Sequence, residues 1–139
     1  MTRMLQLTAG VATDVGRVRD HNEDAALASE SVFVVADGMG GHAAGEVASD
    51  IAARTVGRLD GMARLRLHDI VAQVEEANRT ILRSAENDPR QAGMGTTLAG
   101  LAVIEVSGSA HWAVFNIGDS RVYRLSQDGE LELVTVDHS

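Results

Sequence analysis

Apolar residues recur along the chain with two different periods, and the change of period separates expected strands from expected helices. A short apolar run over 31–36, rich in β-branched residues, predicts a strand buried on both faces. Loose alternation over 5–14 predicts an earlier strand, and 25–28 is weakly strand-like. From Ala43 to about Leu59, apolar residues instead recur every three or four positions, which predicts an amphipathic helix.

The second half repeats this change of period in the opposite direction. Helical spacing over 67–82 predicts a longer helix that stops before Asn87-Asp88-Pro89. An antiparallel meander of four strands should follow, joined by tight turns, over 98–106, 111–117, 121–125 and 131–136. This order predicts an α+β fold, in which two long helices pack on one face of antiparallel sheet.

The expected strand over 31–36 runs directly into an aspartate, Asp37, and a cluster of glycines. Gly38, Gly40 and Gly41 favour turns and close backbone approach, so the strand should end there. Two interpretations stay open. The segment is either a plain strand-turn-helix junction, or a carboxylate presented beside backbone that an ion or phosphate can approach. It is not a Walker loop, because no Lys-Ser/Thr pair follows.

A polar cluster over 17–24 is the second candidate for chemistry. It contains Arg19, four residues before Glu23 and five before Asp24. A solvated loop with a surface ion pair is the ordinary explanation. If 25–28 pairs with the following strand, however, these carboxylates come near Asp37. Arginine suits phosphate oxygens, and clustered carboxylates suit a hard divalent cation.

Asp119 has two interpretations as well: an ordinary hairpin-turn residue, or a third carboxylate presented from a strand end. The five histidines show no spacing typical of zinc, so we expect them to be structural or exposed.

Composition narrows the classes of function. The net charge of −8 argues against nucleic acid or an anionic membrane as the main partner. The chain has no cysteine, which excludes disulfides, thiolate metal sites and cysteine nucleophiles. No apolar run approaches the roughly 20 residues of a membrane span, and the N-terminus lacks a signal-peptide core. We therefore expect a cytoplasmic protein.

Five segments, in this order and spacing, resemble the metal-dependent protein phosphatases, the type-2C serine/threonine phosphatases, in their bacterial form. The segments are Thr13–Arg19 with Asn22–Asp24, Val35–His42 with Gly45-Glu46, Met94–Thr97, Asn116–Arg121 and Thr135–Ser139. The resemblance covers essentially the whole chain. It implies an α-β-β-α sandwich, of which the sheet and helices expected above would be part.

The resemblance also implies roles for individual residues. Arg19 matches the arginine that binds phosphate, and Asp37 matches the aspartate that bridges two metals, with the neighbouring carbonyl on Gly38. Glu23 matches a glutamate that holds a metal-bound water, supported by Asp24. Asp119 matches an aspartate associated with an additional, weaker metal.

One position departs from the family's pattern. Some members carry a histidine, proposed as a general acid, directly after the Asp-Gly pair. Met39 stands there in this chain, and the role is not transferred to His42.

By the same resemblance, the family's domain continues past its Asp-His-Ser segment and supplies two more metal-binding aspartates. We therefore expect residues 1–139 to be the N-terminal portion of a type-2C phosphatase domain, truncated at its C-terminus. Its metal cluster should be incomplete, and its sandwich should lack strands.

Two functions are carried forward. The first is hydrolysis of phosphoserine and phosphothreonine in proteins by water activated between two divalent metals, Mn²⁺ or Mg²⁺, with a third in some sites. The implied partners are phosphorylated proteins, substrates of a serine/threonine kinase. The alternative is a catalytically incomplete fragment or pseudophosphatase that acts as a binding or regulatory module.

Overall fold

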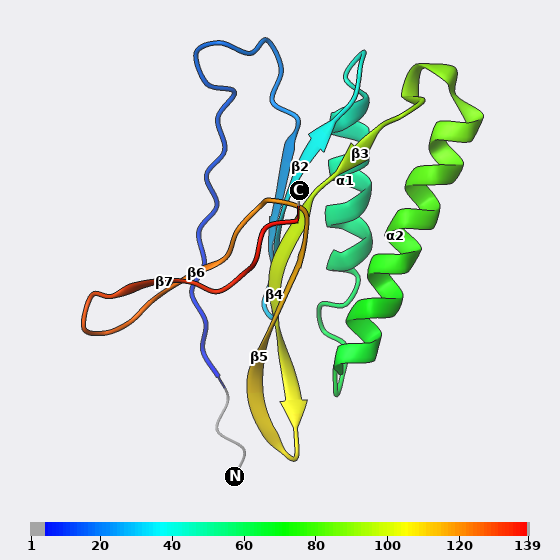
Figure 1. Ribbon diagram of the computed structural model, residues 1–139. Helices are drawn as coiled ribbons and strands as arrows, with labels where there is room; N and C mark the ends of the chain where they lie inside the picture. The colour runs from blue at the N-terminus through cyan, green and yellow to red at the C-terminus, as the bar shows by residue number, and fades with distance from the viewer. Residues whose placement is uncertain (1–4, 139) are drawn as a thin grey trace.

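Two helices lie on the same side of an antiparallel sheet in the computed structural model, which describes residues 5–138 (Figure 1). The main sheet has the order β1-β2-β4-β5, with β3 paired to the end of β2. The fold class predicted from the sequence is thus confirmed. The strands are β1 (Asp24–Ala28), β2 (Val32–Met39), β3 (Gly95–Thr96), β4 (Leu98–Val106), β5 (Ser109–Ile117), β6 (Tyr123–Leu125) and β7 (Leu131–Leu133). The helices are α1 (Ala44–Gly57), α2 (Leu67–Asn87) and a short 3₁₀ turn, η1 (Pro89–Gln91).

Strand β2 crosses the middle of the molecule and is buried on one face only. Its residues alternate, so that Val32, Val34 and Ala36 are buried while Val35 is 46% exposed. Helix α1 packs against β2 through buried small residues, and α2 packs against α1. The prediction that this strand is buried on both faces is wrong, because among the described residues the helices cover one face and the other faces outward.

The glycine cluster does not end β2 where the sequence predicted. The strand continues through Asp37 and Gly38 to Met39, paired with β1 on one side and β3 on the other. A Cβ atom on Gly38 would lie 1.9 Å from the carbonyl oxygen of Gly45 in α1. This glycine therefore serves the close approach of helix to strand rather than a turn.

The strand predicted over 5–14 does not form. This segment has no regular secondary structure and lies along the outward side of the sheet (Figure 1). Within the described residues it makes no ladder of backbone hydrogen bonds with a strand. Alternation alone was misleading here, because a strand also needs a neighbouring edge with which to pair.

The four-stranded meander predicted for the second half is also wrong. β4 and β5 pair along their full length, but β6 and β7 form a separate two-stranded sheet. The chain leaves the main sheet at Gly118, whose φ of +102° is a conformation that residues with a side chain rarely adopt. No helix within residues 5–138 has the length and apolar content needed to cross a membrane.

Candidate functional site

Asp24 lies directly opposite Asp37 in the antiparallel pair of β1 and β2. The pairing β1 makes with β2 is thus the one on which the predicted site depended. Both aspartates are exposed, on the face of the sheet that points away from the helices. Residues directly opposite each other on one face have neighbouring side chains, so the register itself brings two carboxylates together.

The electrostatics of Asp37 reflect this crowding. Partial burial raises the pKa of Asp37, and the charges of Asp24 and Asp119 raise it further. A hydrogen bond between the carboxyl groups of Asp24 and Asp37 acts in the same direction, while the charge of Arg19 lowers the pKa. Two carboxylates that disfavour each other's charge form an environment that a cation relieves.

A hollow of about 130 Å³ opens beside this pair. It is lined by Asp14, Val15, Arg19, His21, Asn22, Glu23, Asp24 and Asp37. Four of the predicted site residues therefore meet around one small, strongly polar space, which Arg19 lines together with the three acidic members of this set. An arginine suits the oxygens of a phosphate group in such a place.

Glu23 is fixed at this hollow by a close contact between α1 and β2. Its carbonyl oxygen accepts hydrogen bonds from the Gly38 amide (3.1 Å) and from the Ser49 hydroxyl (2.7 Å). A Cβ atom on Gly45 would lie 2.8 Å from a carboxylate oxygen of Glu23. The glycine pair Gly38–Gly45 thus leaves the space that the Glu23 side chain occupies, beside the first turn of α1. The N-terminus of a helix favours a carboxylate there.

Asp119 belongs to the site at a greater distance. It does not line the hollow, but its charge contributes to raising the pKa of Asp37. A chain of hydrogen bonds also joins the Asp37 backbone to the side chain of Ser120, the residue that follows Asp119. The Thr97 hydroxyl accepts from the Asp37 amide (2.9 Å) and bonds the Ser120 hydroxyl (2.5 Å), while the Thr97 amide donates to the Asp37 carbonyl (2.9 Å).

Met39 and His42, the two positions compared with the family's general-acid histidine, lie outside the hollow. Met39 is 63% exposed and its side chain contacts Gly95. His42 is exposed in the loop before α1. Neither residue lines the hollow.

Sequence reasoning missed two residues that organise the site. Asn22 donates to the Thr13 hydroxyl (2.6 Å) and accepts from the Asp24 amide (3.0 Å), so it ties the N-terminal segment to β1. Thr97 links Asp37 to the Ser120 turn, although in the sequence it stood out only as part of the matching segment Met94–Thr97. Asn22 stood within a recognisable polar cluster, whereas nothing in the sequence marked Thr97 as a contact of Asp37.

The donor set fits a hard divalent cation. Carboxylate and carbonyl oxygens are the ligands such cations prefer, and Mg²⁺ commonly binds through one or two carboxylates while keeping several waters. Among residues 5–138, no group of three or more histidine, aspartate or glutamate side chains is placed to hold an ion. The described residues therefore offer a carboxylate pair rather than a closed cage.

Comparison with known proteins identifies the relatives of this chain. Residues 17–139 match the family model described as protein phosphatase 2C. The serine/threonine phosphatase Stp of Listeria welshimeri is 38% identical over 138 residues, which cover 91% of this chain and 53% of that protein. The serine/threonine protein phosphatase PstP of Mycobacterium tuberculosis is 38% identical over 135 residues, covering 96% of this chain and 25% of PstP.

The solved structures that are similar to this chain are also serine/threonine phosphatases. The crystal structure of M. tuberculosis PstP matches with a TM-score of 0.78 and 40% identity, covering 88% of this chain and 51% of that one. The catalytic domain of PstP in complex with two manganese ions matches with a TM-score of 0.77 and 40% identity, covering 88% and 52%. The chain therefore spans about half the length of the Listeria phosphatase and of these crystallised chains.

Proposed function

Because the chain belongs to the protein phosphatase 2C family, we propose that it supplies the phosphate-binding and metal-binding residues for hydrolysis of phosphoserine and phosphothreonine in proteins. The observation that carries this proposal is the register of β1 and β2, which sets Asp24 opposite Asp37 beside the hollow that Arg19 lines. That combination provides oxygen ligands for cations and a guanidinium for phosphate in one place.

Each residue has a proposed part. Asp37 and the Gly38 carbonyl would hold the divalent cations, with Glu23 acting through a bound water and Asp24 supporting it. Asp119 would serve an additional, weaker cation. Two or three Mn²⁺ or Mg²⁺ ions, when bound, would supply a water activated for attack on phosphorus. Arg19 would bind the non-bridging phosphate oxygens and stabilise the charge that gathers on them.

The proposed reaction also fixes the class of partner. Substrates would be proteins phosphorylated on serine or threonine by a kinase, and the protein would act in bacterial signalling in the cytoplasm. We further propose that residues 1–139 are the N-terminal portion of the phosphatase domain, with the remaining metal ligands outside it. The coverage of about half of the Listeria phosphatase and of the crystallised PstP chain supports this division.

A second candidate function follows from the same carboxylate pair. Because the described residues hold no group of three metal-binding side chains, the chain alone would bind cations weakly and act as a binding or regulatory module. The two candidates differ in turnover, not in where the cation sits.

Hydrolysis of a phosphothreonine peptide in the presence of Mn²⁺ tests the first candidate. We expect release of phosphate that a chelator abolishes and that Asp37→Asn lowers at least about 100-fold, since even residues that only support metal ligands are worth 10-fold to 100-fold. Asp128→Asn is the matched control, because this exposed aspartate lies in the β6–β7 turn. Mn²⁺ binding without turnover favours the second candidate, and turnover that is indifferent to Asp37 contradicts the first.

A further inference from the structure

The turn that carries Asp119 is held by a segment far from it in the sequence. Gly118 precedes Asp119, and both of its backbone polar groups bond a single residue, His138. The His138 amide donates to the Gly118 carbonyl (2.8 Å), and the Gly118 amide donates to Nδ1 of the His138 imidazole (3.3 Å). An imidazole nitrogen accepts a hydrogen bond only when it carries no proton, so this contact requires the neutral ring with its proton on Nε2.

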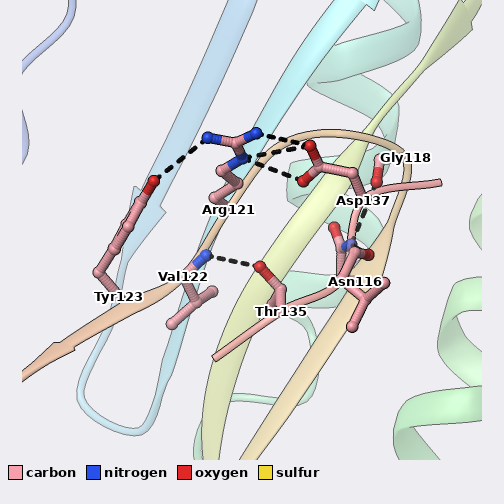
Figure 2. A network of polar contacts seen from close by, with 8 residues as sticks. Asn116, Gly118, Arg121, Val122, Tyr123, Thr135 and Asp137 are labelled. Atoms are coloured by element: carbon pink, nitrogen blue, oxygen red, sulfur yellow. Dashed lines mark hydrogen bonds and ion pairs between the residues drawn. The ribbon is translucent and has the colours of Figure 1, made fainter. Parts of the chain in front are cut away.

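The other end of the turn is held by the residue next to His138. Arg121 donates from Nε to both carboxylate oxygens of Asp137 (3.0 and 3.3 Å) and from Nη2 to one of them (2.7 Å). Figure 2 shows this fork, together with the hydrogen bond from Arg121 Nη1 to the Tyr123 hydroxyl (3.3 Å). A fork of this kind fixes geometry as well as adding energy.

A third contact joins the same two segments. The side-chain amide of Asn116 donates from Nδ2 to the carbonyls of Gly118 (3.1 Å) and Val136 (2.9 Å). Residues 136–138 therefore bond the chain on both sides of Asp119, at Asn116 and Gly118 before it and at Arg121 after it. Asp119 itself contributes no hydrogen bond to this network in the described residues.

We propose that Asp137 and His138, with Arg121, form a clamp of positioning residues that fixes Asp119 relative to Asp37. The clamp acts through the turn: Ser120 bonds Thr97, and Thr97 bonds the backbone of Asp37 in both directions. The turn requires glycine at position 118, because a Cβ atom there would lie 2.7 Å from the Thr97 side chain. This inference rests on the proposed function for the significance of the two aspartates, but the clamp itself is a property of the chain without metal.

Three variants and a control test it on the 139-residue chain. His138→Ala removes the acceptor for the Gly118 amide, while His138→Asn restores a short side-chain acceptor. Arg121→Gln breaks the fork with Asp137. Arg90→Gln is the matched control, because it breaks another exposed arginine–aspartate pair, Arg90–Asp88 (3.1 Å), which lies just after α2 and outside the clamp.

The first measurement needs no metal. Amide hydrogen exchange at Gly118 should become roughly 5-fold to 10-fold faster in His138→Ala, the effect of losing one hydrogen bond. The Asp37 amide resonance should shift in His138→Ala and in Arg121→Gln, and His138→Asn should return both readouts to the wild-type values. Nitrogen shifts of the imidazole should show His138 protonated on Nε2 and bare on Nδ1.

The second measurement is Mn²⁺ affinity, read from the free-ion signal in electron paramagnetic resonance. We expect about a 10-fold loss in Arg121→Gln and in His138→Ala, the lower end of what a supporting residue is worth, and no change in Arg90→Gln. If the wild type binds no Mn²⁺, the proposed function fails while Gly118 exchange and the Asp37 resonance still decide the clamp. Unchanged exchange and resonance in His138→Ala, or an equal loss of affinity in Arg90→Gln, overturns the clamp.

Discussion

Asp24 faces Asp37 across two antiparallel strands, and this pairing of like charges is the feature on which the proposed site depends. Like charges directly opposite each other in a sheet destabilise it, so the pair is retained at a cost of roughly 0.2–1 kcal/mol. A cation that binds between them removes that cost. The stability of the chain should therefore depend on both carboxylates and on divalent cations.

Asp37→Asn should make the metal-free chain slightly more stable, by a few tenths of a kcal/mol, because it removes the repulsion from Asp24. It should also abolish stabilisation by Mn²⁺. At a concentration 100-fold above the dissociation constant, Mn²⁺ should add about 2.7 kcal/mol to the free energy of unfolding of the wild type. Urea unfolding with and without Mn²⁺ measures both effects. Asp128→Asn is the control, and an equal response to Mn²⁺ in Asp37→Asn would contradict the site.

The pKa of Asp37 should lie above its ordinary value of about 3.9, because partial burial and then the charge of Asp24 disfavour ionisation. The folded chain then binds this proton more tightly than the unfolded chain. The stabilising contribution is full below the unfolded pKa and is lost as the pH rises through the raised value. Carbon-13 titration of the carboxyl groups measures this pKa, and Mn²⁺ should displace the midpoint downward. A midpoint below 3.9 in the metal-free chain would refute this electrostatic description.

The pKa of Asp137 should shift in the opposite direction, because hydrogen bonds from Arg121 favour its ionised form. Its contribution to stability is then present above about pH 3.9 and is lost as the pH falls through the lowered pKa. The same titration should show Arg121→Gln returning the Asp137 midpoint toward its ordinary value, while Arg90→Gln leaves it unchanged. A midpoint insensitive to Arg121 would mean that the fork does not persist in solution.

Gly38→Ala should destabilise the fold strongly, because the new Cβ atom would lie 1.9 Å from the Gly45 carbonyl oxygen and force α1 away from β2. Overpacking of this kind costs about 1–3 kcal/mol or more. Gly41→Ala is the matched control, since a Cβ atom there meets nothing within 4 Å. Urea unfolding of the two variants compares them, and equal stability would show that the helix and strand do not approach this closely.

The periodicity of apolar residues predicted much of the fold, because it reflects which side of each helix or strand is buried. The helical spacing from Ala43 and from Leu67 identified α1 and α2, and the apolar run at Leu98–Val106 identified β4 with the observed bounds. The strand over 5–14 failed because pairing, not alternation, makes a strand. The continuation of β2 through Gly38 was missed for a related reason. A glycine is needed there because α1, a later segment of the chain, packs closely against β2 at this residue.

The residues of the candidate site likewise divide into those that the local sequence indicated and those that only the fold brings in. Arg19, Glu23, Asp24 and Asp37 were singled out from the sequence, and the structure brings them to one hollow because β1 pairs with β2, which was the pairing considered from the sequence. The contact of Thr97 with Asp37 could not be foreseen because it depends on how β3 pairs with β2. The contacts of His138 depend on where the chain turns at Gly118 and returns after β7. These are long-range contacts, which carry no local signal in the sequence.

Paramagnetic broadening by Mn²⁺ tests the central claim most directly. With the isotope-labelled 139-residue chain and substoichiometric Mn²⁺, we predict that the amide resonances of Asp24, Asp37 and Gly38 broaden first, followed by Asp119. In Asp37→Asn this local broadening should disappear. If Mn²⁺ instead broadens resonances near other acidic residues, such as Glu75 and Glu76 on α2, or leaves Asp37 sharp, the proposed metal site is wrong.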